Sequence, residues 1–184
     1  MSNGKFVGAN DGGSSTALLE LVRVLSRRKP KETLQFVFFD GEEAQRHWSE
    51  SDSLYGSRYF VEELVRSGRR EKMKAMILLD MVGDKDLVLE FDSSSTSELM
   101  ELVRKSAQEL GYSKHIARVS KGILDDHVPF IQAGIPAVDL IDYEYGLNNL
   151  YWHTPNDTLD KISAQSLKIV GEIVLKTIEK LSRN

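Results

Sequence analysis

Short, continuously apolar runs recur along this chain and are separated by segments with helical spacing. The clearest runs are Leu34–Phe39, Ala75–Leu79 and Ala137–Ile141, and Leu87–Phe91 is a weaker fourth. Runs of this length without polar alternation suit strands that are buried on both faces of a mostly parallel sheet. With helices between the strands, the pattern predicts an α/β fold with a mixed, mostly parallel central sheet flanked by helices on both faces.

Four amphipathic helices are expected around these runs. The first follows Ser14–Ser15, which is expected to cap it, and the second is ended by Gly68. The third begins at a capping box, Ser95–Glu98, and stops at Gly111. The last carries apolar residues at helical spacing, namely Leu167, Val170, Ile173, Val174, Ile178 and Leu181.

Composition excludes several classes of protein. The chain has 184 residues, the size of one domain, and residues 1–184 are treated as a single catalytic-type α/β domain. It has no Cys, which excludes thiol nucleophiles and Cys-based metal sites. A net charge of −4 gives no reason to expect nucleic acid as a partner. No run is long enough to span a membrane, and the N-terminus lacks the apolar core of a signal peptide, so the compartment stays unassigned.

Acidic side chains and a histidine follow the predicted strands, where chemistry tends to gather in open α/β sheets. They are Asp11 in a Gly-rich turn, Glu42 and Glu43, Asp80, and His153. A catalytic zinc typically takes three protein ligands, and Asp11, Glu43 and His153 would supply such a set. Glu42 would then lie beside the metal as a general acid/base. Spacing alone leaves open that these acids only form turns or favour a helix start.

Longer strings carry a resemblance to a known family. Leu34–Arg58 resembles the glutaminyl-peptide cyclotransferases (glutaminyl cyclases), in which a Phe-Phe-Asp-Gly-Glu-Glu run precedes Trp-Ser and Asp-Ser-Leu-Tyr-Gly-Ser-Arg segments. Other motifs match in the same order: Gly8–Asp11, Leu78–Gly83, Asp125–Pro136 and Tyr151–Thr154. The resemblance runs from about Phe6 to the last helix. His153–Ile162 is also similar to the wider zinc aminopeptidase superfamily of this fold.

The resemblance implies a role for each residue that matches a family motif. Asp11, Glu43 and His153 are implied to bind one zinc ion. Glu42 is implied to be the general acid/base. This implied ligand set agrees with the one that donor chemistry proposes.

Further positions around the implied metal site also match the family. Asp80 and Asp125 are implied to complete a catalytic hydrogen-bond network, although the Asp80 position binds a second zinc in the two-metal aminopeptidases. Trp48 and Trp152 are implied to line the substrate pocket, and packing in a core or at a rim is an equal alternative. We expect His127 to pack or hydrogen-bond locally.

The function implied by the resemblance is a zinc-dependent acyltransferase reaction. It would convert N-terminal glutaminyl peptides to pyroglutamyl peptides with release of ammonia. Two alternatives stay open. One is a zinc aminopeptidase of the same superfamily, and the other is a non-catalytic, truncated fragment.

The sequence departs from the family pattern at its beginning. Family members carry helices, sheet strands and a His-x-Asp motif before the Gly-Ala-x-Asp motif, and these have no counterpart here. We therefore expect a domain that is N-terminally truncated relative to the family and lacks its N-terminal strands. Because the missing His binds one metal in the two-zinc enzymes, a one-metal site is favoured. An exposed sheet edge predicts self-association or a poorly ordered N-terminal end.

Overall fold

The computed structural model describes residues 8–28 and 30–183, in which two helices are followed by two strands, and single helices and strands alternate after them. The helices are α1 Ala9–Leu25, α2 Tyr55–Arg66, α3 Ser97–Glu109, α4 Val128–Gln132 and α5 Ala164–Leu181. The strands are β1 Met76–Asp80, β2 Leu89–Asp92, β3 Ile116–Lys121 and β4 Ala137–Ile141. Short 3-10 turns lie at Arg70–Lys72, Ser113–His115 and Leu147–Asn149.

The strands form two parallel pairs. β1 runs alongside β4, with Met76 opposite Ala137 at the start of the register. β2 runs alongside β3, with Leu89 opposite Ile116. Parallel strands separated by helices confirm the predicted α/β fold class.

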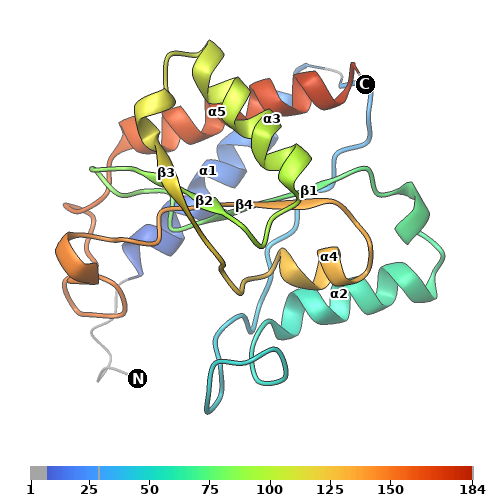
Figure 1. Cartoon of the computed structure of the whole chain (residues 1–184), viewed down its shortest axis with the longest axis horizontal. Coiled ribbons are helices and arrows are strands. Elements are labelled where there is room, and N and C mark those ends of the chain that lie inside the picture. Colours follow the sequence, from blue (N-terminus) through green and yellow to red (C-terminus); the bar gives the residue numbers. More distant parts are fainter. Residues whose placement is uncertain (1–7, 29, 184) are drawn as a thin grey trace.

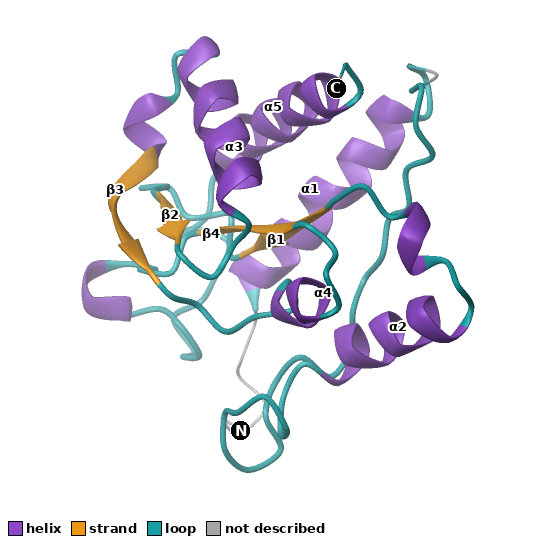
Figure 2. Cartoon of the chain, turned by 45° about the vertical axis from the view of Figure 1, so that its right-hand side comes forward, coloured by secondary structure: helices purple, strands orange, loops and turns teal. Residues whose placement is uncertain are grey.

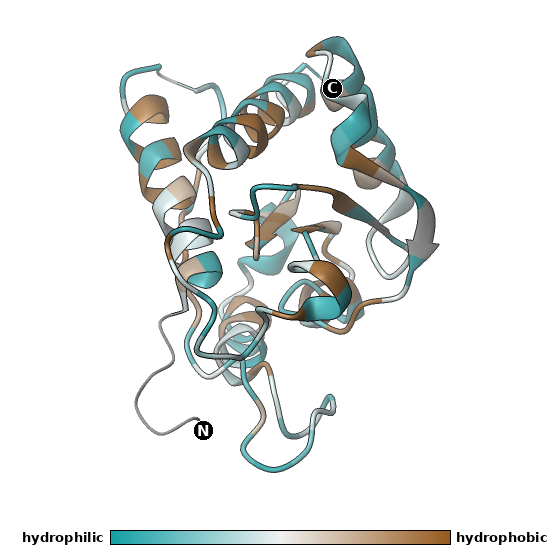
Figure 3. Cartoon of the chain, turned by 90° about the vertical axis from the view of Figure 1, so that its left-hand side faces the viewer, coloured by the Kyte–Doolittle hydropathy of each residue, from teal (hydrophilic) through white to brown (hydrophobic). Residues whose placement is uncertain are grey.

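Helices cover both faces of the β1–β4 pair (Figure 1). On one face, apolar residues of α1, α3 and α5 form the largest hydrophobic cluster together with Val138 and Leu140 of β4. On the other face, Val61 of α2 and Phe130 beside it in α4 form a second cluster that includes Ala137. Successive side chains of a strand point to opposite faces, so β4 contributes to both clusters, and all five of its residues are buried. Hydrophobic and hydrophilic residues alternate along the helices, as expected when one side is buried (Figure 3).

The first helix begins earlier than predicted, so the capping role expected of Ser14 and its neighbour is wrong. Gly8 adopts a left-handed conformation with φ of 60°, and α1 starts directly after it. Such a backbone is strained for residues with a side chain but not for glycine. The side chain of Asn10 then accepts a hydrogen bond from the backbone N–H of Gly83, 2.6 Å away. Asp11 therefore lies in the first turn of a helix held close to the end of β1, and not in a loop.

The capping box predicted at residues 95–98 is also wrong. Thr96 holds the cap position of α3, but its side chain makes no capping hydrogen bond. The Ser95 hydroxyl instead donates to Asp92 at 2.6 Å and accepts from the backbone N–H of Asp139 at 2.9 Å. Ser95 therefore connects the end of β2 to the middle of β4 through hydrogen bonds and does not cap α3.

The other predicted helix ends are confirmed. Gly68 follows α2 with φ of 66°, and Gly111 follows α3 with φ of 78°, both left-handed conformations that end a helix. α5 contains all the predicted apolar residues. Ser163 caps it by accepting a hydrogen bond from the backbone N–H of Ser166 at 3.0 Å.

The Leu34–Phe39 run does not form the predicted strand. The described residues between α1 and α2 form neither strand nor helix (Figure 2). A strand needs a neighbour to complete its hydrogen bonds, and the described residues provide none for this run. Leu34 and Phe36 still pack against the largest cluster, and Phe39 packs against the second. Phe38 remains 53% exposed.

β1 is the exposed member of its strand pair. All five residues of β1 are only half-buried, whereas those of β4 are fully buried. Among the described residues, β4 is the one strand that pairs with β1. This agrees with the expected free sheet edge, while self-association through that edge stays a prediction. The expectation of a poorly ordered N-terminal end concerns residues 1–7, which lie outside the described residues.

Candidate active site

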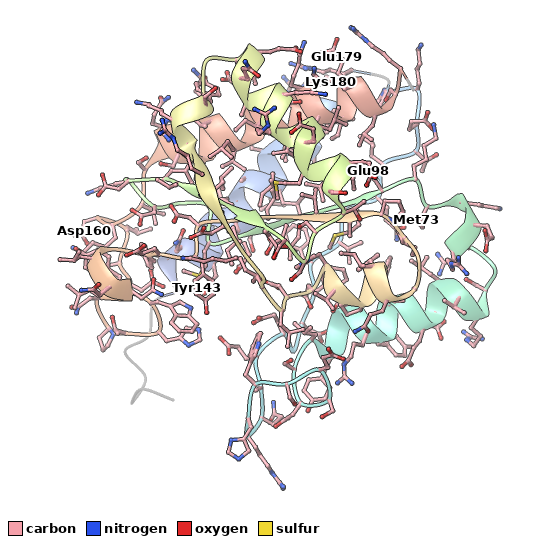
Figure 4. All side chains as sticks on the ribbon, viewed as in Figure 1. Met73, Glu98, Tyr143, Asp160, Glu179 and Lys180 are labelled. Atoms are coloured by element: carbon pink, nitrogen blue, oxygen red, sulfur yellow. The ribbon has the colours of Figure 1, made fainter. Side chains whose placement is uncertain are left out.

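A cavity of about 1050 Å³ runs along the whole of β1 to its carboxyl end, against the irregular segment that follows α1. Met73 and Tyr143, two of its lining residues, lie toward opposite sides of the molecule, so the cavity extends across the centre (Figure 4). All eight residues predicted from the sequence line this cavity: Asp11, Glu42, Glu43, Trp48, Asp80, Asp125, Trp152 and His153. The fold therefore gathers segments that are far apart in the chain.

The three residues predicted to bind metal come from three separate segments. Asp11 lies in the first turn of α1, Glu43 follows the irregular run, and His153 lies in the loop between β4 and α5. The Nε2 atom of His153 is 2.7 Å from Oε1 of Glu43. Burial raises the pKa of Asp11, the nearby carboxyl of Asp157 adds to the rise, and His153 opposes it. Asp11 is thus within electrostatic reach of the Glu43–His153 pair.

His153 is held by its surroundings in an uncommon backbone conformation. Its φ of 53° is left-handed, which few non-glycine residues adopt and which persists where neighbouring groups enforce it. The Trp152 ring stacks on the imidazole, with centroids 4.3 Å apart and planes 25° apart. Asp157, further along the loop, accepts hydrogen bonds from the Asn10 backbone at 3.2 Å and the Tyr145 hydroxyl at 2.8 Å. These contacts connect the loop to the start of α1.

Glu42 directly precedes Glu43, one of the three predicted ligands, and its carboxyl group resists ionisation. Burial raises the pKa of Glu42 to about 8, and the nearby charges of Asp125 and Glu43 add to the effect. Its backbone carbonyl accepts a hydrogen bond from the N–H of Leu54 at 2.8 Å, which fixes the segment. A carboxyl group with a pKa near neutrality can both take and give a proton, as a general acid/base must.

Two further acids share the cavity wall with Glu42. Asp80 is half-buried and lines the cavity. The protein around it raises its pKa well above the usual range by burial, and the nearby charges of Asp125 and Asp11 raise the pKa further. Burial raises the pKa of Asp125 to about 7. The adjacent Asp126 accepts a hydrogen bond from the hydroxyl of Ser57 in α2 at 2.5 Å. Because nearby negative charges oppose one another's ionisation, these carboxyl groups keep their protons to a higher pH than isolated carboxyl groups do.

The charge balance of the cavity favours a cation. Six carboxyl side chains line it, Asp11, Glu42, Glu43, Asp80, Asp125 and Asp126, against the basic lining residues Lys121 and His153. Carboxylate oxygen and imidazole nitrogen are donors that zinc takes, commonly three per catalytic site. The Asp11–Glu43–His153 set therefore fits zinc by its donor chemistry.

Aromatic side chains surround the mouth of the cavity. Trp48 and Trp152 both line it and are 45% and 39% exposed. The Tyr143 ring lies 6.1 Å from the Trp152 ring, measured between centroids. Partly exposed aromatic rings beside polar groups are typical of small-molecule and peptide pockets.

A second cluster of acids and a histidine, which the sequence analysis missed, lies in the interior. Asp92, His127 and Asp139 are buried, and one potential ligand atom from each lies within 4.8 Å of the others. His127 was expected to make only local contacts, but its neighbours come from β2 and β4. The one signal in the sequence was an acid, Asp139, inside an otherwise apolar run.

The layered fold and the acid–histidine cavity define a protein of the zinc aminopeptidase and glutaminyl cyclase type. Residues 1–178 match peptidase family M28, and the chain belongs to that family. It is 42% identical to a glutaminyl cyclase of an Acidobacteriales bacterium, with a TM-score of 0.89 over 97% of this chain. It is 31% identical to a Zn-dependent exopeptidase of Parabacteroides distasonis, with a TM-score of 0.81 over 93% of this chain.

Curated relatives also include glutaminyl-peptide cyclotransferases, at lower sequence identity. The Drosophila melanogaster glutaminyl-peptide cyclotransferase is 29% identical over 86% of this chain. The alignment covers 51% of that relative, 63% of the Acidobacteriales chain and 63% of the Parabacteroides chain. The chain thus spans about half the length of the curated relative. Within the described part of the chain, no helix is both long and apolar enough to cross a bilayer.

Proposed function

We propose that this chain carries the active site of a zinc-dependent glutaminyl cyclase-like acyltransferase. Its substrates would be peptides with an N-terminal glutamine, converted to pyroglutamyl peptides with loss of ammonia. The observation that supports this most directly is the position of Glu42. Its carboxyl group has a pKa of about 8 and lines the same cavity as the Glu43–His153 pair, beside exposed tryptophans.

The ligand set would hold one zinc ion. Asp11, Glu43 and His153 supply two carboxylates and an imidazole, and the bound ion would polarise the γ-carbonyl of the substrate glutamine. Glu42 is assigned outside this set. Its neighbour Glu43 already pairs with His153, and one free carboxyl beside the metal is what proton transfer requires.

The chain's own residues would move the protons. Glu42 takes a proton from the substrate α-amine as the amine nitrogen attacks the γ-carbonyl carbon. The carbon–nitrogen bond of the side-chain amide then breaks, and Glu42 returns the proton to the departing ammonia. Asp80 and Asp125, whose pKa values are also raised, hold a shared proton beside Glu42. Trp48 and Trp152 lie where they can pack against the substrate.

A zinc aminopeptidase is the second candidate, and one observation favours it. The similarity to the Parabacteroides Zn-dependent exopeptidase covers nearly as much of the chain as that to the glutaminyl cyclase. In that reading, Asp80 would act as a metal ligand and a water molecule would be the nucleophile. A chain of about half the relatives' length could also keep these residues without a complete site.

One assay separates these readings. The zinc-loaded chain is given a peptide that begins with Gln and another that begins with Leu. Ammonia release from the first without shortening supports the cyclase, and free leucine from the second supports the aminopeptidase. Inertness toward both would overturn the proposed activity and support a non-catalytic fragment.

We further propose that the free edge of β1 mediates self-association. The half-buried strand and the exposed Phe38 beside the cavity leave apolar surface and unpaired backbone groups available. Sedimentation velocity should show a dimer that grows with protein concentration. Phe38→Lys should shift the equilibrium toward monomer, whereas Leu19→Lys, at an exposed site on α1, should not. A chain that stays monomeric at all concentrations would contradict this.

A further inference from the structure

The loop formed by residues 123–127 carries Asp125 into the cavity, and it has little regular structure of its own. It connects β3 to α4. Within it, the Asp125 side chain accepts a hydrogen bond from the Asp126 backbone at 2.5 Å, and the Asp125 carbonyl accepts from Val128 at 2.8 Å. These local bonds shape the loop but do not attach it to the sheet.

One side chain contacts both ends of this loop. Asp92, the last residue of β2, is 1% exposed. Its Oδ1 accepts a hydrogen bond from the backbone N–H of Ile123 at 3.1 Å, at the start of the loop. Its Oδ2 lies 3.0 Å from Nε2 of His127, at the end of the loop. A single carboxylate thus bridges the two ends of the five-residue segment.

The buried imidazole of His127 also reaches β4. His127 is fully buried, and its Nδ1 faces Oδ2 of Asp139 at 3.9 Å. Ser95 adds a second connection, because its hydroxyl donates to Asp92 and accepts from the backbone N–H of Asp139. The end of the loop therefore lies against the end of β2 and the middle of β4.

The arrangement fits a structural tie better than a metal site. The two ring nitrogens of His127 face different carboxylates, so an ion bound at one nitrogen would leave the carboxylate at the other nitrogen as a hydrogen-bond acceptor and not as a third ligand. Burial alone would raise the pKa of Asp92, but the contacts with His127 and Ser95 outweigh burial and lower it, which favours its ionised form. An ionised carboxylate accepts stronger hydrogen bonds than a neutral one.

We propose that Asp92 and His127, backed by Asp139, form a clamp that positions Asp125 in the active site. Asp92 contacts the loop, His127 is its last residue, and neither lines the cavity, so both are positioning residues. The catalytic part of this inference rests on the proposed function, in which Asp125 acts beside Glu42. The structural part, that the clamp holds the 123–127 loop, stands apart from any activity.

Three variants test the clamp. Asp92→Ala removes both contacts with the loop, and Asp92→Asn keeps an oxygen that can accept from Ile123. His127→Ala removes the tie at the other end. Thr177→Val is the control, because Thr177 is equally buried but bonds within α5, away from the loop.

Hydrogen exchange measured by mass spectrometry reports on the loop directly. Asp92→Ala and His127→Ala should speed exchange in the peptide that spans residues 123–127, while α5 keeps its protection. Asp92→Asn should largely restore protection, and Thr177→Val should leave the loop unchanged. Unaltered exchange in both alanine variants would overturn the clamp. If an alanine variant fails to fold, His127→Gln decides on the same readout: faster exchange in the loop supports the clamp, and an unchanged loop would again overturn it.

Kinetics on the zinc-loaded chain test the catalytic part. Misplacing a catalytic group by about 1 Å can cost on the order of 100-fold in rate. Asp92→Ala should therefore lower kcat by about 10- to 100-fold with little change in KM, and Asp92→Asn should recover most of it. Equal kcat in Asp92→Ala and the parent would overturn the positioning role. An inactive parent chain would count against the proposed function alone, because hydrogen exchange still decides the clamp.

Metal analysis tests the remaining alternative, a buried metal site at Asp92, His127 and Asp139. Zinc measured per chain should be the same in the parent and in Asp92→Ala, since the clamp holds no ion. Loss of one bound ion in Asp92→Ala, with the first still present, would overturn the clamp in favour of a buried metal site.

Discussion

Replacing Glu42 with Gln is expected to abolish turnover while zinc stays bound. Gln has nearly the same size and shape as Glu but cannot take a proton from the substrate amine. Positioned general acid/base groups typically contribute about 10²–10⁴-fold to rate, and kcat should fall by an amount in this range. Glu43 and His153 already face each other at 2.7 Å without Glu42, so the ligand set is unaffected by the change. Ammonia release and zinc content, measured on the same preparation, check both halves of the expectation.

Two further substitutions test whether the effect of Glu42→Gln is specific to the proposed general base. Glu50→Gln makes the same chemical change on an exposed loop and should leave both activity and metal content unchanged. Glu43→Gln should lose zinc as well as activity, because Glu43 is a proposed ligand. Full activity in Glu42→Gln would refute the acid/base assignment. Loss of zinc from Glu42→Gln would mean that Glu42 is the zinc ligand and Glu43 the general base.

Sequence pattern predicted the strands whose partners are present in the chain. The apolar runs at 75–79 and 137–141 became β1 and β4, which pair with each other. The equally apolar run at 34–39 did not become a strand, because an apolar pattern encodes burial and not the identity of a neighbouring strand. β3 was missed because it is a strand without a continuous apolar run. It carries the charged residues Arg118 and Lys121, which interrupt any apolar run.

The candidate site residues, whose roles stay predictions, could be identified in the sequence for a different reason. Asp11, Glu43 and His153 belong to ordered motifs that can be read one segment at a time, although only the fold shows that the segments meet. Asp92, His127 and Asp139 form no such motif. Their arrangement depends on the end of β2 and the middle of β4 lying next to the 123–127 loop, and no local pattern in the sequence carries that information.

Zinc is expected to stabilise the fold, and more strongly as the pH rises. The folded-state pKa values of Glu42 and Asp125, about 8 and about 7, lie above the unfolded values of 4.5 and 3.8. Without metal, the folded chain therefore keeps protons that the unfolded chain has released, so stability is present at low pH and is lost as the pH rises from about 4 toward 8. Zinc would compete with protons for its proposed ligand Asp11, whose pKa is also raised by burial, and its positive charge would lower the pKa values of Glu42 and Asp125 nearby, so its binding should offset that loss mainly near pH 8.

Removing one ligand should cancel this effect. A free zinc concentration of about 100 times Kd stabilises a folded chain by about 2.7 kcal/mol, which thermal unfolding at pH 8 with and without zinc can detect. His153→Ala should lose nearly all of that gain and weaken zinc binding by more than about 100-fold, because it removes a ligand and not merely a group supporting one. His47→Ala, in an exposed loop, should keep the full gain. Equal stabilisation of both variants would mean that zinc binds elsewhere. A gain that shrinks between pH 5 and pH 8 would mean that the cavity carboxylates do not bind the metal.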